Sequence, residues 1–154
     1  MKNIAIFISG KGSNASRMIE AFSTHDKIQV VVLISSKPNE AILDLCEKHK
    51  VRFLETSWEA QDHEKILQVL KNNTIQWLVL AGFLKKIPSS LISVFPNRII
   101  NLHPSLLPKF GGKGMYGMHV HTAVIASKEI ESGISIHYVN EAYDEGQIIQ
   151  QYKV

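Results

Sequence analysis

Short apolar runs alternate with segments of helical period along the whole chain, and this alternation restricts the fold more than any other feature. Apolar runs without alternation are typical of strands buried on both faces, and the helical segments supply the crossovers that parallel strands need. We therefore predict an α/β fold, an open, doubly wound, mostly parallel sheet of seven strands with helices on both faces. The predicted strands are residues 3–8, 29–34, 52–55, 77–81, 98–102, 135–139 and 147–152. The predicted helices are residues 14–23, 41–48, 63–71, 89–94 and 121–127.

The composition fits one compact domain. Of the 154 residues, 45% are hydrophobic and 20% are charged, which suffices for one substantial core, so we expect residues 1–154 to form a single domain. The formal net charge is only +3, and the Lys and Arg residues are scattered. This distribution weakly favours small anionic substrates and argues against a nucleic-acid partner.

The start of the chain and its cysteine content bear on location. The first three residues lead directly into an apolar strand and then a glycine, which is too short for a signal peptide or a membrane span, so we expect no membrane association. The single cysteine, Cys46, lies in a helical pattern, and we predict a buried thiol rather than a reactive one. One cysteine forms no disulfide framework, which suits a reducing cytoplasm.

A polar pair closes the fifth predicted strand. Asn101 and His103 are two residues apart, so their side chains point to the same side of a strand, and Pro104 ends the strand by removing an N–H donor. A carboxamide beside an imidazole suits a reaction in which an oxygen gains negative charge and a proton moves. The simpler interpretation is a strand end whose polar side chains make turn hydrogen bonds.

The first predicted strand runs into Ser9-Gly10-Lys11-Gly12-Ser13-Asn14 and then a helix. Glycines let the backbone approach a phosphate, and the free N–H groups and dipole of a helix N-terminus favour its charge. The segment is neither G-x-G-x-x-G nor a Walker loop, which disfavours a dinucleotide or a nucleoside triphosphate. A structural turn in which Ser13 or Asn14 caps the helix is equally compatible with these residues.

Three later segments could line the same cleft. Residues 77–88 form a buried strand that leaves through Gly82 into an apolar turn, which could hold a flat heterocycle or simply pack on the next helix. Residues 111–117 are rich in glycine and predict a mobile loop able to close over a ligand. In the turn at residues 143–146, Asp144 could reach an imidazole from a neighbouring strand end, or the segment could be an ordinary surface turn.

The remaining histidines give a weaker signal. His119 and His121 precede or begin a predicted helix, but no third ligand of matching spacing follows, so we expect capping or substrate contact and no metal. We expect the other histidines of loops, helices and strands to be structural or exposed. They are His25, His49, His63 and His137.

Taken in this order, the motifs resemble those of the phosphoribosylglycinamide formyltransferases of purine biosynthesis. The resemblance runs from Met1 to Val154 and includes residues 8–14, 80–84, 101–110, 111–121 and 144–146. It implies a Rossmann-like formyltransferase fold and transfer of a formyl group from 10-formyltetrahydrofolate to the amine of glycinamide ribonucleotide. The expected partners are these two small molecules. The sequence leaves open whether the protein is a monomer or a homodimer.

The resemblance also implies roles for individual residues. The expected catalytic residues are Asn101, His103 and Asp144. The expected phosphate-binding residues are Gly12, Ser13 and Asn14. The expected folate contacts are Leu84, Lys85, Ile87, Asn101, Asn140, Glu141 and Asp144, with Lys85 at a position often held by Arg. The residues expected to line the substrate channel are Pro104, His119 and His121.

The end of the chain departs from the family pattern, because relatives continue beyond the last strand into a segment that supplies an acidic contact near the ribonucleotide. We therefore expect a domain that is short at its C-terminus. Three alternatives stay open: a core like that of methionyl-tRNA formyltransferase, a formyltetrahydrofolate hydrolase with water as acceptor, and a folate- and phosphate-binding domain without turnover. The first two families usually carry an additional domain, for RNA binding or regulation.

Overall fold

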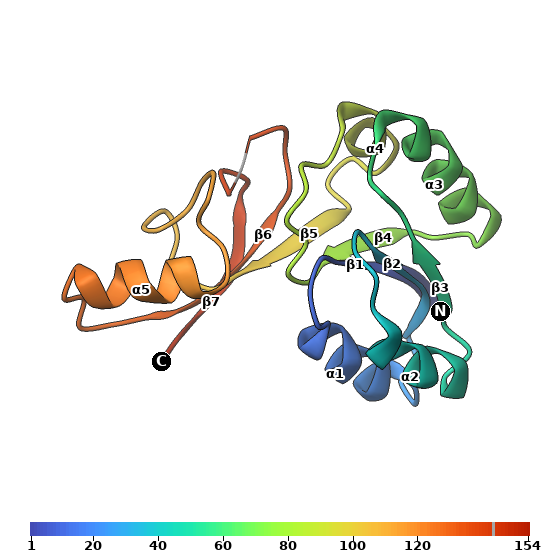
Figure 1. Cartoon of the computed structure of the whole chain (residues 1–154), viewed down its shortest axis with the longest axis horizontal. Helices are drawn as coiled ribbons and strands as arrows, with labels where there is room; N and C mark the ends of the chain where they lie inside the picture. Colours follow the sequence, from blue (N-terminus) through green and yellow to red (C-terminus); the bar gives the residue numbers. More distant parts are fainter. Residues whose placement is uncertain (143) are drawn as a thin grey trace.

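The computed structural model describes residues 1–142 and 144–154 (Figure 1). Its strands are β1 (Lys2–Ile8), β2 (Ile28–Ser35), β3 (Arg52–Glu55), β4 (Trp77–Leu80), β5 (Ile99–His103), β6 (Gly133–Tyr138) and β7 (Ile148–Lys153). Its helices are α1 (Ser13–Phe22), the short 3-10 helix η1 (Glu40–Ile42), α2 (Leu43–Lys48), α3 (Ala60–Asn72), α4 (Ser89–Val94) and α5 (Met118–Ala126). No helix in these two ranges is both long and apolar enough to cross a membrane.

All of the strands belong to one sheet, in the order β3-β2-β1-β4-β5-β6-β7. The pairs from β3 to β5 are parallel, whereas β6 pairs antiparallel with both β5 and β7. This arrangement confirms the predicted mostly parallel α/β fold. The antiparallel pairs bring residues from the end of the chain next to the end of β5.

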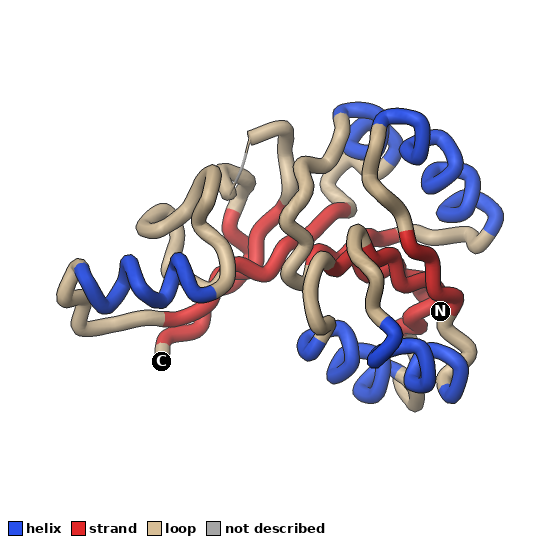
Figure 2. Tube along the Cα trace, in the orientation of Figure 1, coloured by secondary structure: helices blue, strands red, loops and turns tan. Residues whose placement is uncertain are grey.

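Helices cover both faces of the parallel part of the sheet (Figure 2). On one face, Ala15 and Ile19 of α1 and Cys46 of α2 pack against the strands. On the other, Leu70 of α3 and Leu91 of α4 do the same. These side chains are almost fully buried, and removing them from water is the main favourable contribution to folding. The predicted buried state of Cys46 is confirmed, and its burial raises the thiol pKa to about 11.

The sheet order reverses between β1 and β4, which lie side by side at its centre. In an open α/β sheet, ligands bind in the crevice outside the carboxyl ends of the strands at such a reversal. We therefore expect a ligand to bind near the segments that leave β1 and β4. They contact each other, because the Ser9 N–H donates to the Gly82 carbonyl at 3.1 Å.

Two helices begin three residues earlier than predicted. Helix α3 starts at Ala60 rather than His63, because Glu59 and Asp62 form a reciprocal capping box at its N-terminus. Helix α5 starts at Met118 rather than His121, so that His119 lies in its first turn. Strand β5 ends at His103, one residue beyond its predicted end and directly before Pro104.

Candidate active site

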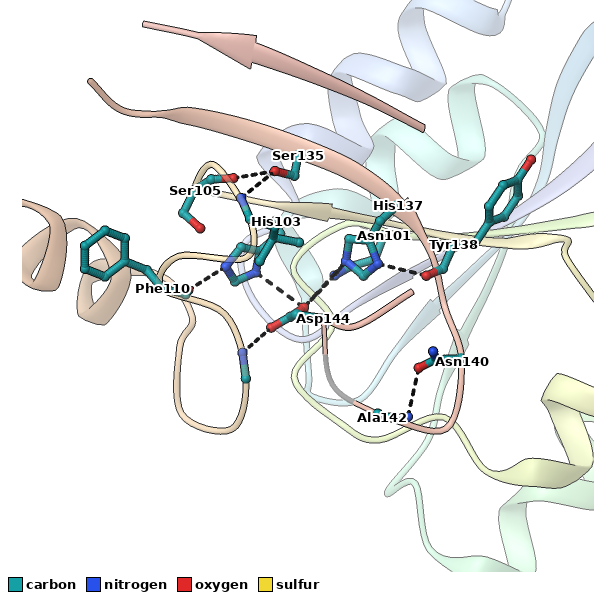
Figure 3. A network of polar contacts seen from close by, with 12 residues as sticks. Asn101, His103, Ser105, Phe110, Ser135, His137, Tyr138, Asn140, Ala142 and Asp144 are labelled. Carbon is teal, nitrogen blue, oxygen red and sulfur yellow. Dashed lines mark hydrogen bonds and ion pairs between the residues drawn. The ribbon is translucent and has the colours of Figure 1, made fainter. Parts of the chain in front are cut away.

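The carboxyl end of β5 carries the centre of the site. Asn101 and His103 lie on the same side of this strand, and the β5–β6 register places His137 directly opposite Asn101. Asp144 follows β6 in the chain, and its carboxylate lies between the His103 ring and the side chains of Asn101 and His137 (Figure 3). The structure therefore brings together the three residues expected to be catalytic and adds His137 as a fourth.

His137 fixes the orientation of Asn101. The Nδ1 atom of this buried imidazole lies 2.8 Å from the Tyr138 carbonyl, which can only accept, so Nδ1 carries the hydrogen. In the neutral imidazole, Nε2 accepts from the Asn101 Nδ2 atom at 3.1 Å, and this bond fixes which way the Asn101 carboxamide points. In the imidazolium, Nε2 instead carries a hydrogen toward Oδ1 of Asp144, 3.5 Å away.

Both ring nitrogens of His103 have protein partners. The Nε2 atom lies 2.8 Å from the Phe110 carbonyl, so it carries a hydrogen. The Nδ1 atom lies 3.4 Å from Oδ1 of Asp144, and both side chains are largely buried. Each ring nitrogen of His103 therefore faces an acceptor.

Asp144 is the acceptor shared by this cluster. Its Oδ2 accepts the Gly112 N–H at 2.9 Å, and its Oδ1 accepts from Asn101 Nδ2 at 3.4 Å and lies 3.5 Å from Nε2 of His137. Burial raises the pKa of Asp144, but His137, the Gly112 amide and the charge of His103 together outweigh it and lower the pKa below its ordinary value. The carboxylate is therefore ionised at neutral pH.

A second polar network anchors the segment that follows β5. The Ser135 hydroxyl of β6 donates to the Ser105 carbonyl at 2.7 Å and accepts from the Leu107 N–H at 3.0 Å. Gln151 of β7 donates to the Leu107 carbonyl at 3.0 Å and to the Ser135 hydroxyl at 2.8 Å. These bonds hold the backbone that carries the Phe110 carbonyl toward His103.

The arrangement can stabilise an oxyanion and move a proton. A carboxamide N–H and an imidazolium N–H are suitable donors to an oxygen that gains negative charge, and the neighbouring carboxylate holds the imidazolium in place. Among residues 1–142 and 144–154, no group of three His, Cys, Asp or Glu side chains could hold a metal ion.

The expected phosphate loop lies between β1 and α1. Gly12 is the residue before the helix and has φ +76°, a left-handed conformation that favours glycine. The first bond of the helix runs from Ser16 N–H to the Gly12 carbonyl, which leaves the amide hydrogens of Ser13 and Asn14 without an intrahelical acceptor. Both residues are exposed, and the Asn39 side chain supports the loop by donating to the Gly10 carbonyl at 2.9 Å.

The expected folate segment follows β4. Leu84 is 39% exposed, and Lys85 is exposed beside it, whereas Ile87 is buried in the core with 4% exposure. Its side chain therefore packs in the protein, and a ligand contact from Ile87 would come from its backbone.

Asn140 and Glu141 lie in the connection after β6 and are exposed. They help to line a cavity of about 590 Å³ beside α4. The described residues that line this cavity do not include Asn101, His103 or Asp144.

The structure does not gather the expected channel residues into the cluster. Pro104 is half-buried directly after His103, but His119 and His121 are exposed on α5, at the end of the molecule that carries β6 and β7 (Figure 1). His119 packs edge-to-face against Tyr116, with ring centroids 5.2 Å apart. Within residues 1–142 and 144–154, no side-chain hydrogen bond joins either histidine to Asn101, His103 or Asp144.

Sequence reasoning missed His137 and the backbone groups of Phe110 and Gly112. His137 occupies a buried position in the alternating pattern of β6, a weak signal that becomes informative only when the β5–β6 register is known. The contribution of Phe110 and Gly112 comes from their carbonyl and amide groups, which every residue other than proline offers.

Comparisons of the sequence and of the fold with known proteins lead to the same family. The sequence profile of the formyl transferase family matches residues 2–154. The chloroplastic phosphoribosylglycinamide formyltransferase of Arabidopsis thaliana is 39% identical over 160 residues, which cover 99% of this chain and 55% of that protein. Phosphoribosylglycinamide formyltransferase of Bacillus subtilis (strain 168) is 31% identical over 98% of this chain and 78% of that protein.

Solved structures have the same fold. Phosphoribosylglycinamide formyltransferase from Bacillus halodurans superposes with a TM-score of 0.86 at 31% identity, covering 99% of this chain and 79% of that one. Glycinamide ribonucleotide transformylase 1 from Geobacillus kaustophilus gives 0.87 at 31% identity, covering 100% and 82%. The present chain spans 55% and 50% of the two plant relatives, from Arabidopsis thaliana and Vigna unguiculata.

Proposed function

Because this chain belongs to the formyl transferase family, whose profile matches residues 2–154, we propose that it transfers a formyl group from 10-formyltetrahydrofolate to the amine of glycinamide ribonucleotide. The single observation that supports this most is the contact of Asp144 with His103, 3.4 Å apart, beside Asn101 at the end of β5. We propose further that residues 1–154 act as one formyltransferase domain.

In this reaction the substrate amine attacks the formyl carbon. A C–N bond forms, and the carbonyl oxygen becomes the oxyanion of a tetrahedral intermediate. Protonated His103 donates a hydrogen bond to this oxyanion, and so does Asn101 once its Nδ2 atom exchanges its contact with His137 or Asp144 for the oxyanion. The bond from the same carbon to the folate nitrogen then breaks, the oxyanion becomes a carbonyl again, and the formylated product leaves.

Asp144 holds the His103 imidazolium in place and assists the proton transfer. The attacking amine loses one proton, and the departing folate nitrogen gains one, so the reaction needs no net acid or base. The ionised Asp144 carboxylate is suited to relay this proton, directly or through water.

His103 exchanges a partner when substrate binds. Its Nε2 hydrogen is engaged by the Phe110 carbonyl and its Nδ1 faces Asp144. Donation from Nε2 to the reacting oxygen therefore requires the Phe110 carbonyl to move aside, while Asp144 keeps the ring in place.

The two substrates approach from the segments that leave β1 and β4. The ribonucleotide phosphate binds the free amide hydrogens at Gly12, Ser13 and Asn14, since a helix N-terminus favours an anion. The folate binds along Leu84, Lys85 and Ile87 and beside Asn140 and Glu141, with its formyl group beside Asn101 and Asp144. The Ser9–Gly82 hydrogen bond that joins the first two segments supports this placement of both ligands in one crevice.

A direct assay separates this reaction from its alternatives. The protein is incubated with a 10-formylfolate analogue, with and without glycinamide ribonucleotide, and both formylated ribonucleotide and free formate are measured. We expect product only when the ribonucleotide is present. Formate released at the same rate without ribonucleotide would instead identify a hydrolase, and binding of both ligands without turnover would identify a binding domain.

The proposed location is a reducing compartment, the cytoplasm. The buried free thiol of Cys46 supports this choice, because such a residue is typical of proteins that do not meet oxidising conditions. A plastid stroma is the alternative suggested by the plant relatives that are named chloroplastic. Localisation of a fluorescent fusion in the source cell distinguishes the two.

A further inference from the structure

Trp58, in the connection between β3 and α3, combines an unusual backbone conformation with burial. Its φ is +60°, in the left-handed region that a bulky side chain rarely adopts. The residue is nevertheless 8% exposed, so its indole is directed into the protein. Such a conformation persists only where the surroundings impose it.

The surrounding turn imposes this conformation. The Trp58 N–H donates to the Thr56 hydroxyl at 3.0 Å, and the Asp62 carboxylate accepts from the hydroxyls of Thr56 at 3.0 Å and Ser57 at 2.6 Å. Asp62 also accepts the Glu59 N–H as part of the capping box of α3. The indole therefore projects from a turn that is fixed on both sides.

The Trp58 indole contacts the segment that follows β4. It packs edge-to-face on Phe83, with ring centroids 4.7 Å apart, and its Nε1 donates to the Lys86 carbonyl at 2.9 Å. The same segment is held at Leu84, whose N–H donates to the Ser9 hydroxyl at 2.9 Å, and at the buried side chain of Ile87. The hydrogen bond from Trp58 to Lys86 therefore holds this segment at a point between Leu84 and Ile87.

This bond determines the direction of one backbone donor. In a trans peptide unit the carbonyl and the following N–H point in opposite directions, so the Lys86 carbonyl directed at Trp58 turns the Ile87 N–H away from it. Within residues 1–142 and 144–154, the Ile87 N–H has no hydrogen-bond acceptor. It is therefore a fixed donor in the segment expected to contact folate.

We propose that Trp58 is a positioning residue for the folate co-substrate, acting through the Lys86–Ile87 peptide. It touches neither the reacting atoms nor the ribonucleotide. When the indole N–H is lost, the Lys86 carbonyl is released and the Ile87 donor is no longer held in one direction, so folate affinity falls. This inference rests on the proposed function, because it requires folate to bind at this segment.

The test compares two Trp→Phe variants. Trp58→Phe keeps an aromatic ring against Phe83 but removes the hydrogen bond to Lys86. Trp77→Phe is the matched control, because the Trp77 side chain makes no hydrogen bond within residues 1–142 and 144–154. Binding of a 10-formylfolate analogue is measured by calorimetry without ribonucleotide, together with kcat and both KM values.

We expect Trp58→Phe to weaken binding of the folate analogue by about three- to tenfold, the loss typical of one hydrogen bond. Its KM for the ribonucleotide and its kcat stay within about twofold of the parent values, as do all values for Trp77→Phe. A purely structural role would instead reduce the folded fraction, which lowers the apparent kcat and the binding stoichiometry and leaves the folate affinity and both KM values unchanged. Folded Trp58→Phe with parental folate affinity would overturn the proposal.

A second measurement needs no change at Trp58. The chain has two tryptophans, so Trp77→Phe leaves a single indole N–H signal in a ¹H–¹⁵N spectrum, that of Trp58. This signal is expected to shift when the folate analogue is added and to stay in place with ribonucleotide alone. An unmoved signal at saturating folate overturns the role of Trp58 while leaving the proposed function intact. A parent protein that binds no folate overturns both.

Discussion

At the scale of single residues, His103 is the group on which the proposed chemistry depends most. Its two ring nitrogens face the Phe110 carbonyl and the Asp144 carboxylate, so that the ring is held from both sides. We expect His103→Ala and Asp144→Asn each to lower the rate of formyl transfer by about 10²-fold or more, because each removes a positioned charge from the oxyanion or proton path. Steady-state kinetics at saturating concentrations of both substrates measures the loss.

Asp26→Asn is the matched control, since Asp26 is a carboxylate whose side chain is 81% exposed. It should keep the parental rate. Circular dichroism shows whether the two active-site variants remain folded. Parental activity in both folded variants would contradict the roles assigned to His103 and Asp144.

Part of the candidate site could be predicted from the sequence. The two-residue spacing of Asn101 and His103 sufficed to predict that both face one side of β5. The role of His137 was not predictable, because its place depends on an antiparallel register between strands that are separated by α5 and its flanking loops. The role of the Phe110 carbonyl was not predictable either, because any residue at that position has a backbone carbonyl.

At the scale of elements, the predicted strands agree with the structure within about two residues at each end, as expected when apolar runs define buried strands. The helix starts were less well predicted. Helix α3 begins three residues early because its capping box involves Glu59 and Asp62, an acidic pair in place of the usual hydroxyl residue.

The N-terminus of α1 gives a prediction at this scale. Ser13→Asp places a negative charge where the ribonucleotide phosphate is proposed to bind, which should stabilise the helix end but raise the KM for ribonucleotide by about tenfold or more. The KM for folate should change little. Initial rates with each substrate varied in turn give both values.

Gln61→Asp, an exposed position in the first turn of α3, adds the same charge to another helix N-terminus and serves as the control. It should leave both KM values at the parental level. Equal increases in both KM values for Ser13→Asp would indicate that the loop before α1 has only a structural role.

The connection between β6 and β7 gives a second prediction. A Cβ atom at Gly146 would clash with the Tyr138 carbonyl oxygen, so Gly146→Ala requires the backbone to shift. We expect the free energy of unfolding to fall by about 2 kcal/mol or more. At Gly10 a Cβ atom meets nothing within 4 Å in the described chain, and Gly10→Ala should change stability by less than about 0.5 kcal/mol. Urea denaturation of both variants measures the difference, and similar midpoints would contradict it.

At the scale of the whole molecule, the lowered pKa of Asp144 makes stability depend on pH. A carboxyl group whose pKa is lower in the folded protein stabilises it above the unfolded pKa of about 3.9, and this contribution is lost as the pH falls through the folded value. Asp144→Asn should therefore lower the free energy of unfolding by about 1–2 kcal/mol at pH 7 and by progressively less below about pH 4.

Urea denaturation of the parent and of Asp144→Asn at pH 7 and pH 3 measures this change. A difference that is equal at the two pH values would show that the charge of Asp144 does not stabilise the fold. Asp26→Asn should show little difference at either pH, because its exposed carboxylate interacts mainly with solvent.

The antiparallel attachment of β6 to β5 has a consequence for the order of folding. The contacts of Asn101 with His137 and Asp144 join residues that are 36 and 43 positions apart, and β6 must pair with β5 before either can form. Closing such loops costs more chain entropy than forming the local β-α units of the parallel part. During refolding, helical structure should therefore return before catalytic competence, so that recovery of activity reports the long-range strand pairing of both β1 with β4 and β5 with β6.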